Sequence, residues 1–286
     1  MIDDAEMFDM SNEKYQKLKE ILAGMGSVLV AFSGGTDSSL VLKVARDVLG
    51  DKAIAMTAVS ASLPTAERLE ALQVARLIGA RHILVDSEET SDPAYLANTP
   101  NRCFFCKKET YGKLSAYAEQ HGFQTIVDGT NADDSGDYRP GRKAASEYHV
   151  RSPLLEAGFG KAEIRQLSKE LGLPNWDKPA AACLSSRIPY GTTITLETLS
   201  QVERAEALLH GLGLRQLRVR HHGAVARIEA EPEDFARLLE HRQEIVTTMK
   251  AIGFTFIALD LAGFHSGSMN AGINANIQST PAQAGR

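Results

Sequence analysis

The stretch that decides the fold is Val28-Leu-Val-Ala-Phe32, followed directly by Ser33-Gly-Gly-Thr-Asp-Ser-Ser39. The apolar, β-branched run predicts a buried strand, and the apolar residues between Leu40 and Val48 recur at helical spacing. Between them, two glycines let backbone N–H groups approach an anion closely. The helix N-terminus adds unpaired donors and a positive dipole end. The segment therefore predicts a strand, a phosphate-binding loop and a helix, rather than a turn that merely joins two elements.

Asp37 is the unusual residue of this loop. A carboxylate beside phosphates repels them unless a cation lies between, so Asp37 is expected to act with Mg²⁺ or to cap the helix. The Gly-Lys-Ser/Thr ending of a Walker loop is absent. The loop instead resembles the SGGxDS loop of the PP-loop ATP pyrophosphatases, which hold the β,γ-diphosphate of ATP as a leaving group and transfer AMP to a substrate oxygen. The ATP-binding residues that this resemblance implies are Ser33, Gly34, Gly35, Asp37, Ser38 and Ser39.

Length and composition suit a globular protein of two domains. The chain has 286 residues and a net charge of −5, which argues against a surface made for nucleic acid. No apolar run approaches the about 20 residues of a membrane helix, and the N-terminus lacks a signal-peptide pattern. The three cysteines cannot all pair within one chain, so thiols and a cytoplasmic location are expected.

Strand-like and helix-like segments alternate along the first part of the chain. Beyond the first strand, strands are expected at 53–59, 82–85 and 125–127, and helices at 1–27, 64–79, 107–121 and 161–171. This order predicts an α/β fold with a doubly wound, mostly parallel sheet of the PP-loop pyrophosphatase type. Because ligands bind beyond the carboxyl ends of such strands, the loops after strands one, two and four are the expected nucleotide site.

The remainder predicts a smaller C-terminal α+β domain. A β-hairpin is expected from Leu217 to Ala230, a helix at 235–250 and a strand at 254–259. The expected domains are 1–190 and 191–275, and the tail 276–286 is expected to be disordered.

The loop at 128–142 is long, polar and rich in glycine, and loops of this length are usually functional or disordered. Asp133, Asp134 and Asp137 suit a contact with Mg²⁺ or ribose. A solvated surface loop explains the same residues, and the sequence leaves both interpretations open.

Cysteines mark two places in the chain. Cys103-Phe-Phe-Cys106 lies just before an expected helix, and Cys183 lies in a second irregular segment. A C-x-x-C pair is a common metal or redox device, and three converging thiolates can hold a [4Fe–4S] cluster with one iron left open. The pattern alone slightly favours three unrelated thiols.

Arg218 and Arg220 lie two residues apart on an expected strand, so both face one side while Leu217 and Val219 face the core. Paired guanidiniums make good phosphate forks. Cross-strand pairing with Glu229 is an equal alternative.

With these residues collected, the chain from the first strand to about residue 270 resembles the LarE family of ATP-dependent sulfur transferases, which build the nickel-pincer nucleotide cofactor. The resemblance rests on Ser33-Gly-Gly-Thr-Asp-Ser-Ser39, Gly129-Thr-Asn-Ala-Asp-Asp134 with Asp137-Tyr-Arg-Pro-Gly141, Trp176-Asp-Lys-Pro179 with Ala182-Cys-Leu-Ser-Ser-Arg187 and Pro189-Tyr-Gly191, and Arg218-Val-Arg220. It implies that MgATP adenylylates a carboxylate of pyridinium-3,5-biscarboxylate mononucleotide. Sulfur then reaches the activated acyl carbon and gives a thiocarboxylate.

The resemblance also implies residue roles. Cys183 and Asp37 are catalytic, and Gly129 and Asn131 complete the ATP site. The implied contacts to the substrate phosphate are Ser186, Arg187, Arg218 and Arg220. The implied metal ligands are Glu206 and Glu229, which are the weaker assignment, and the three cysteines for iron and sulfur. Sulfur comes either from Cys183, which is left as dehydroalanine, or from a sulfide on a [4Fe–4S] cluster held by Cys103, Cys106 and Cys183, as in the cluster-bearing branch of the family.

The implied partners are a small-molecule nucleotide, a second copy of the chain in a homo-oligomer, and a nickel-inserting enzyme that takes the product; no nucleic acid or membrane is expected. Three other functions share parts of the pattern. A PP-loop tRNA 2-thiolation enzyme predicts a large basic face. An ATP-dependent amide-forming ligase shares the loop but needs no thiols. A non-enzymatic ATP-binding regulator predicts no release of diphosphate.

Overall fold

The computed structural model describes residues 4–136, 141–179 and 181–265. The chain divides into two compact units. The first comprises Met1–Tyr95 and Asn101–Ala181, and the second comprises Leu96–Pro100 and the chain from Ala182 onward. The domains 1–190 and 191–275 stay predictions, and the tail 276–286 lies outside the described residues.

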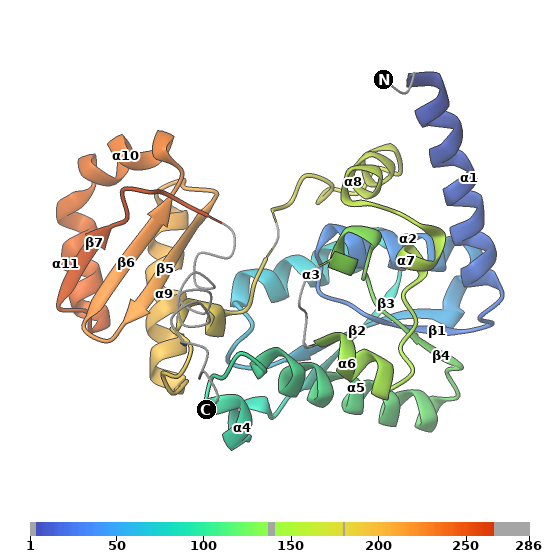
Figure 1. Ribbon diagram of the computed structural model, residues 1–286, viewed down its shortest axis with the longest axis horizontal. Helices are drawn as coiled ribbons and strands as arrows, with labels where there is room; N and C mark the ends of the chain where they lie inside the picture. Colours follow the sequence, from blue (N-terminus) through green and yellow to red (C-terminus); the bar gives the residue numbers. More distant parts are fainter. Residues whose placement is uncertain (1–3, 137–140, 180, 266–286) are drawn as a thin grey trace, which may run out of the picture. The chain divides into compact units, whose positions relative to one another are not determined.

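The first unit is built on a four-stranded parallel sheet (Figure 1). Its strands are β1 (Val28–Ala31), β2 (Ala53–Val59), β3 (Arg81–Asp86) and β4 (Thr125–Val127), in the spatial order β3-β2-β1-β4. From β1 the chain moves outward to β2 and β3 and then returns to the other side of β1 as β4. The direction of winding therefore reverses between β1 and β4, at the position where open parallel sheets bind ligands.

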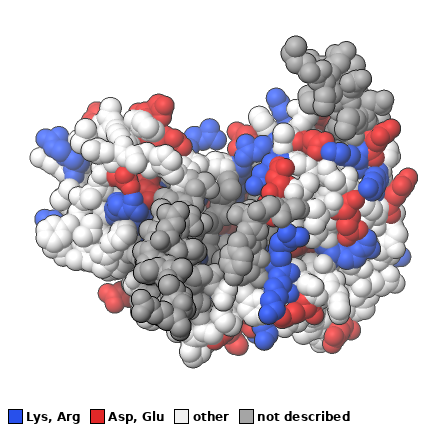
Figure 2. All heavy atoms as spheres, viewed as in Figure 1, with Lys and Arg blue, Asp and Glu red and all other residues white. Residues whose placement is uncertain are grey.

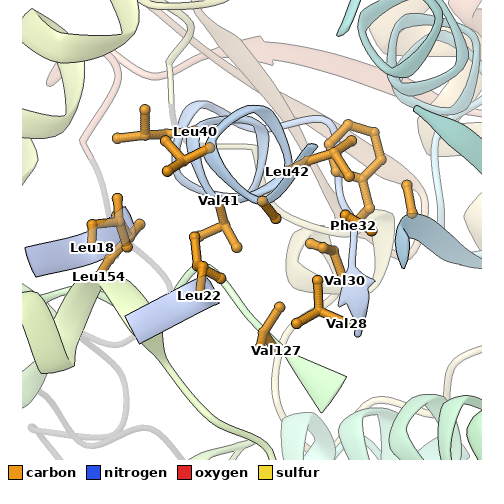
Figure 3. Packing of buried hydrophobic residues seen from close by; sticks show 14 of the residues in the cluster. Leu18, Leu22, Val28, Val30, Phe32, Leu40, Val41, Leu42, Val127 and Leu154 are labelled. Carbon is orange, nitrogen blue, oxygen red and sulfur yellow. The ribbon is translucent and has the colours of Figure 1, made fainter. Parts of the chain in front are cut away.

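Helices cover both faces of this sheet. The helices of this part of the chain are α1 (Asp4–Ala23), α2 (Thr36–Leu49), α3 (Thr65–Ile78), α4 (Pro93–Leu96), α5 (Arg102–His121), α6 (Gly141–Glu147), α7 (Pro153–Ala157) and α8 (Lys161–Glu170). Figure 3 shows the larger core, in which Leu18 and Leu22 of α1 and Val41 of α2 pack with Val28 and Val30 of β1. On the other face, Leu114 and Ala118 of α5 pack in a separate cluster with Leu29, Ile54, Met56 and Ile126. Each fully buried leucine contributes about 1.5–3 kcal/mol, and the predicted α/β fold with a parallel sheet is confirmed.

The second unit contains a three-stranded mixed sheet. Its strands β5 (Leu217–His222), β6 (Val225–Ala230) and β7 (Phe256–Leu259) lie in that order, with β5 and β6 antiparallel and β6 and β7 parallel. The helices α9 (Leu196–Gly211), α10 (Phe235–Glu240) and α11 (Arg242–Ile252) contribute to the core that buries one face of the sheet. Leu217 and Val219 belong to that core, as predicted from their alternation.

Three sequence-based boundaries are wrong. The helix expected at 1–27 ends at Ala23. Helix α5 begins at Arg102, so Cys103 and Cys106 lie in its first turns and not before it. The buried apolar residues of α5 begin only at Tyr111, so its first turns carry no hydrophobic periodicity. The helix predicted at 235–250 is two helices, which meet at His241.

Both signs of charge are present on the face drawn in Figure 2, where lysine and arginine side chains lie near aspartate and glutamate side chains. None of the helices in the described ranges is long and apolar enough to cross a membrane.

Candidate active site

The loop between β1 and α2 depends on two glycines with different geometry. Gly34 has a φ of +72°, and a Cβ there would lie 2.8 Å from the Cα of Ala71 in α3. Only glycine fits that conformation and that space without strain. Gly35 is extended and occupies the N-cap position of α2. Asp37 is therefore a residue of the first turn, and the helix-capping role considered for it is wrong.

Hydroxyl groups close this loop around the start of α2. The Ser33 and Ser38 Oγ atoms lie 3.1 Å apart, and Ser38 Oγ donates to the Gly35 carbonyl at 3.1 Å. The backbone N–H of Ser39 donates to the same carbonyl at 3.0 Å. The N–H groups of the residues before Ser39 thus lie at the positive end of a 14-residue helix, which is a ready-made anion site.

The segment after β4 packs directly on this helix start. A Cβ on Gly129 would lie 2.8 Å from the Ser38 backbone nitrogen, so glycine permits the close approach. Asn131 is fully buried, and its Nδ2 donates to Asp37 Oδ2 at 3.1 Å. The structure therefore brings Gly129 and Asn131 together with the loop after β1, at the point where the sheet reverses its winding.

Asp37 lies in an electrostatic environment that suits a cation. Burial and the nearby Asp134 carboxylate raise the pKa of Asp37, and the hydrogen bond from Asn131 opposes that shift. Carboxylates are preferred ligands of Mg²⁺, so this pair fits the ion that accompanies ATP. Within the described ranges, no three His, Cys, Asp or Glu side chains gather as a metal site of their own.

The loop expected at 128–142 is buried at some positions and exposed at others. Asp128, Asn131 and Asp134 are buried, so a solvated surface loop is the wrong interpretation for these three residues. Asp133 is exposed, and Asp137 lies outside the described residues. Asp128 anchors the segment, because its carboxylate accepts hydrogen bonds from the Thr130 N–H at 3.0 Å and from Ser152 Oγ at 2.8 Å. An aspartate that bonds two residues ahead is typical of a tight turn.

Asn175 is a further residue of this site that the sequence does not reveal, and its side chain donates a hydrogen bond to the loop after β1. Nothing in its neighbourhood except the adjacent Trp176-Asp-Lys-Pro179 motif marks it. Lys178 of that motif pairs with Glu67 at 2.7 Å and Glu70 at 2.8 Å. Because both glutamates belong to α3, the motif is tied to the first unit.

Ser39 is fully buried, and its hydroxyl accepts a hydrogen bond from Asn175. In this structure the Ser39 side chain is on the buried side of the loop, where it bonds to Asn175. A contact between Ser39 and ATP stays a prediction. Ser33, in contrast, is exposed.

In the second unit, Cys183 directly precedes a short 3₁₀ turn, Leu184–Arg187. The Nη1 of Arg187 donates to the Cys183 carbonyl at 2.9 Å. The other donors of this buried guanidinium bind both carboxylate oxygens of Glu206, at 3.0 and 2.9 Å. Arg187 therefore fixes the backbone that carries the Cys183 thiol.

Arg220 belongs to the same network. It donates to Oε2 of the fully buried Glu229 at 2.9 and 2.6 Å, and its Nη1 donates to the Ser186 carbonyl at 3.1 Å. Arg227 pairs with the other oxygen of Glu229 at 3.0 Å. Cross-strand pairing, the alternative considered for the arginines, is thus present for Arg220. Arg218 lies with its guanidinium 5.3 Å from the ring centre of Phe264.

The second unit thus gathers Ser186, Arg187, Glu206, Arg220 and Glu229 around the Cys183 turn. Both glutamates accept hydrogen bonds from guanidinium groups, and a metal-binding role for them stays a prediction.

Cys103 and Cys106 lie one turn apart on α5 in the first unit. Together with Cys183 they are thiols and not disulfides.

A four-stranded parallel sheet with a glycine–serine loop at the reversal of its winding defines this chain as an α/β protein. No protein-family model matches it. It is 47% identical over 263 residues to an uncharacterized protein of Synechocystis sp., spanning 91% of this chain and 98% of that one. It is 40% identical over 258 residues, 90% of this chain and 94% of the relative, to the pyridinium-3,5-bisthiocarboxylic acid mononucleotide synthase of Lactiplantibacillus plantarum. An uncharacterized protein of Methanocaldococcus jannaschii is 28% identical over 239 residues, or 84% of this chain and 91% of its own.

The identity to the synthase extends over nearly the whole of both chains. The chain therefore belongs to the LarE family.

Proposed function

We propose that this protein is an AMP-forming, ATP-dependent sulfur transferase that converts the carboxylates of pyridinium-3,5-biscarboxylate mononucleotide into thiocarboxylates for the nickel-pincer cofactor. The observation that carries the proposal is the anion site between β1 and α2, with Asp37 held by Asn131 at 3.1 Å. The name of the Lactiplantibacillus relative, which describes a bisthiocarboxylic acid mononucleotide as its product, supports the substrate class.

In the first step, the loop Ser33–Ser39 holds the β,γ-diphosphate of ATP. Hydroxyls and helix N–H groups would supply donors, and Asp37 would hold the Mg²⁺, which when bound would neutralise part of the phosphate charge. A carboxylate oxygen of the substrate forms a bond to the α-phosphorus, and the bond from that phosphorus to the bridging oxygen breaks. Diphosphate leaves, and the acyl group now carries AMP, a far better leaving group than oxide.

In the second step, sulfur attacks the acyl carbon, a C–S bond forms, the C–O bond breaks, and AMP leaves. Arg187 holds the Cys183 turn in a fixed conformation, so the thiol is presented from an ordered backbone. Ser186, Arg187, Arg218 and Arg220 are the proposed contacts to the substrate phosphate.

The proposed source of sulfur is a [4Fe–4S] cluster on Cys103, Cys106 and Cys183, and the alternative source is Cys183 itself. In the alternative, the thioester formed with Cys183 is released when its Cβ–S bond breaks and its Cα proton is lost, which leaves dehydroalanine. The donor set fits in kind, because all three residues are thiols and the first two lie one helical turn apart. When bound, the group would supply a sulfide on its open iron. Assembly as a homo-oligomer and transfer of the product to a nickel-inserting enzyme belong to the same proposal.

The experiment is an anaerobic reaction of the purified protein with MgATP, sulfide and the dicarboxylate mononucleotide, followed by mass spectrometry of product and protein. A product with sulfur in place of carboxylate oxygen is expected. Its absence under all conditions contradicts the proposal. An unchanged protein mass with repeated turnover supports the cluster, and the loss of one H₂S per chain supports Cys183 as the donor.

A further inference from the structure

Asn175 is a buried polar residue that the mechanism above does not use. It follows α8 and is 3% exposed, and its side-chain amide donates only to the loop after β1 among the described residues. Its Nδ2 donates to the Gly34 carbonyl at 2.8 Å and to Ser39 Oγ at 2.9 Å. Its own backbone carbonyl accepts from Thr36 Oγ1 at 2.8 Å. Three residues of the anion loop are thus tied to a single asparagine that lies 136 to 141 positions away in sequence.

The orientation of the amide group follows from its partners. A carbonyl can only accept hydrogen bonds, so the group that faces Gly34 must be the NH₂ and not the oxygen. The amide oxygen is left buried, and no donor among the described residues reaches it. An unsatisfied buried acceptor lowers the stability of the folded state by about 1–3 kcal/mol. In this arrangement the amide oxygen is unsatisfied, and the amide NH₂ donates to both Gly34 and Ser39.

The consequence for the loop is geometric. In a trans peptide the C=O and the following N–H point in opposite directions. Because Asn175 holds the Gly34 carbonyl toward the buried side, the Gly35 N–H turns to the other side, where it meets Ser33 Oγ at 3.3 Å. The bond to Ser39, in the first turn of α2, holds the beginning of the helix at the same time.

The geometry points to Asn175 as the positioning residue of the diphosphate subsite: it fixes the peptide between Gly34 and Gly35, with the Gly35 N–H on the side of the Ser33 hydroxyl, before ATP arrives. Preorganised donors bind more tightly because no ordering remains to be done on binding. This inference rests on the proposed function, since it takes the anion of the loop to be the diphosphate of ATP.

The test measures binding of magnesium diphosphate alone and of AMP alone by calorimetry, in the full chain. Asn175→Ala is expected to weaken diphosphate binding about ten-fold or more, while AMP binding changes less than about three-fold. Asn175→Ser keeps one donor, and its affinity for diphosphate is expected to lie between those of the wild type and the alanine variant. If the alanine variant does not fold, the comparison of diphosphate binding with AMP binding is made on the serine variant.

Asn98→Ala is the matched control. Asn98 is fully buried in the second unit, and its Nδ2 donates to the carbonyls of Ile188, Pro189 and Thr192. The control removes a comparable buried amide and should lower the melting temperature without changing diphosphate binding. Wild-type-like diphosphate binding in the Asn175 variants, or an equal loss for diphosphate and AMP, overturns the inference. Failure of the wild-type protein to bind diphosphate overturns the proposed function instead.

Discussion

Replacement of Gly34 by alanine tests whether the loop has the conformation described. Two costs add. The φ of +72° at Gly34 is left-handed, which costs a residue with a side chain about 1–2 kcal/mol. The new Cβ would also lie 2.8 Å from the Cα and Cβ of Ala71, and relief of such overpacking costs about 1–3 kcal/mol. The free energy of unfolding of the first unit should therefore fall by about 2–5 kcal/mol.

The assay is urea denaturation followed by circular dichroism, with Gly35→Ala as the matched control. Gly35 has a φ of −77°, and the nearest atom to its Cβ position is Ser33 Oγ at 3.3 Å. Alanine there changes only the N-cap residue, so the expected loss is below about 1 kcal/mol. A Gly34→Ala variant within about 0.5 kcal/mol of the wild type, the range of a harmless substitution, refutes the reasoning.

Three further predictions follow from the two sites. Because burial and a neighbouring carboxylate raise the pKa of Asp37, the folded state binds its proton more tightly than the unfolded state, and ionisation costs stability as the pH rises through that pKa. Asp37→Asn should therefore melt above the wild type at pH 7, with a difference that shrinks as the pH falls below the raised pKa, yet release no diphosphate; a lower melting point at pH 7 contradicts this. Arg218→Ala should weaken mononucleotide binding by about 1.5–3 kcal/mol with little change for ATP, whereas Arg220→Ala should also lower the melting temperature because it removes a partner of a buried carboxylate. Cys103→Ser and Cys106→Ser should each abolish turnover with added sulfide, and full activity in either variant, measured as thiocarboxylate formed, rejects the cluster.

The sequence was sufficient for the elements whose signal is local. The run at 28–32, the helix after it and the alternation of Leu217 and Val219 each appear in the structure as predicted, because hydrophobic periodicity records which face is buried. The first turns of α5 bury little apolar surface. Their sequence therefore has no hydrophobic periodicity from which the start of the helix could be predicted.

The contacts that complete the two sites are not local. Asn175 meets Gly34 across 141 positions, and Arg187 meets Glu206 across 19. No spacing rule reports such pairs, since they depend on how helices and strands pack. The two interpretations of Arg220 illustrate the limit: the sequence names a phosphate contact and pairing with Glu229 as equal alternatives, and only the fold shows that Arg220 pairs with Glu229.

The measurement that tests the central claim most directly is the identity of the adenine nucleotide formed from ATP. The wild-type protein is incubated anaerobically with MgATP and pyridinium-3,5-biscarboxylate mononucleotide, and the nucleotides are separated by chromatography. A loop that holds the β,γ-diphosphate as a leaving group predicts AMP and diphosphate in equal amounts, dependent on the mononucleotide. ADP and inorganic phosphate as the products would contradict the assignment of the loop, and with it the proposed reaction.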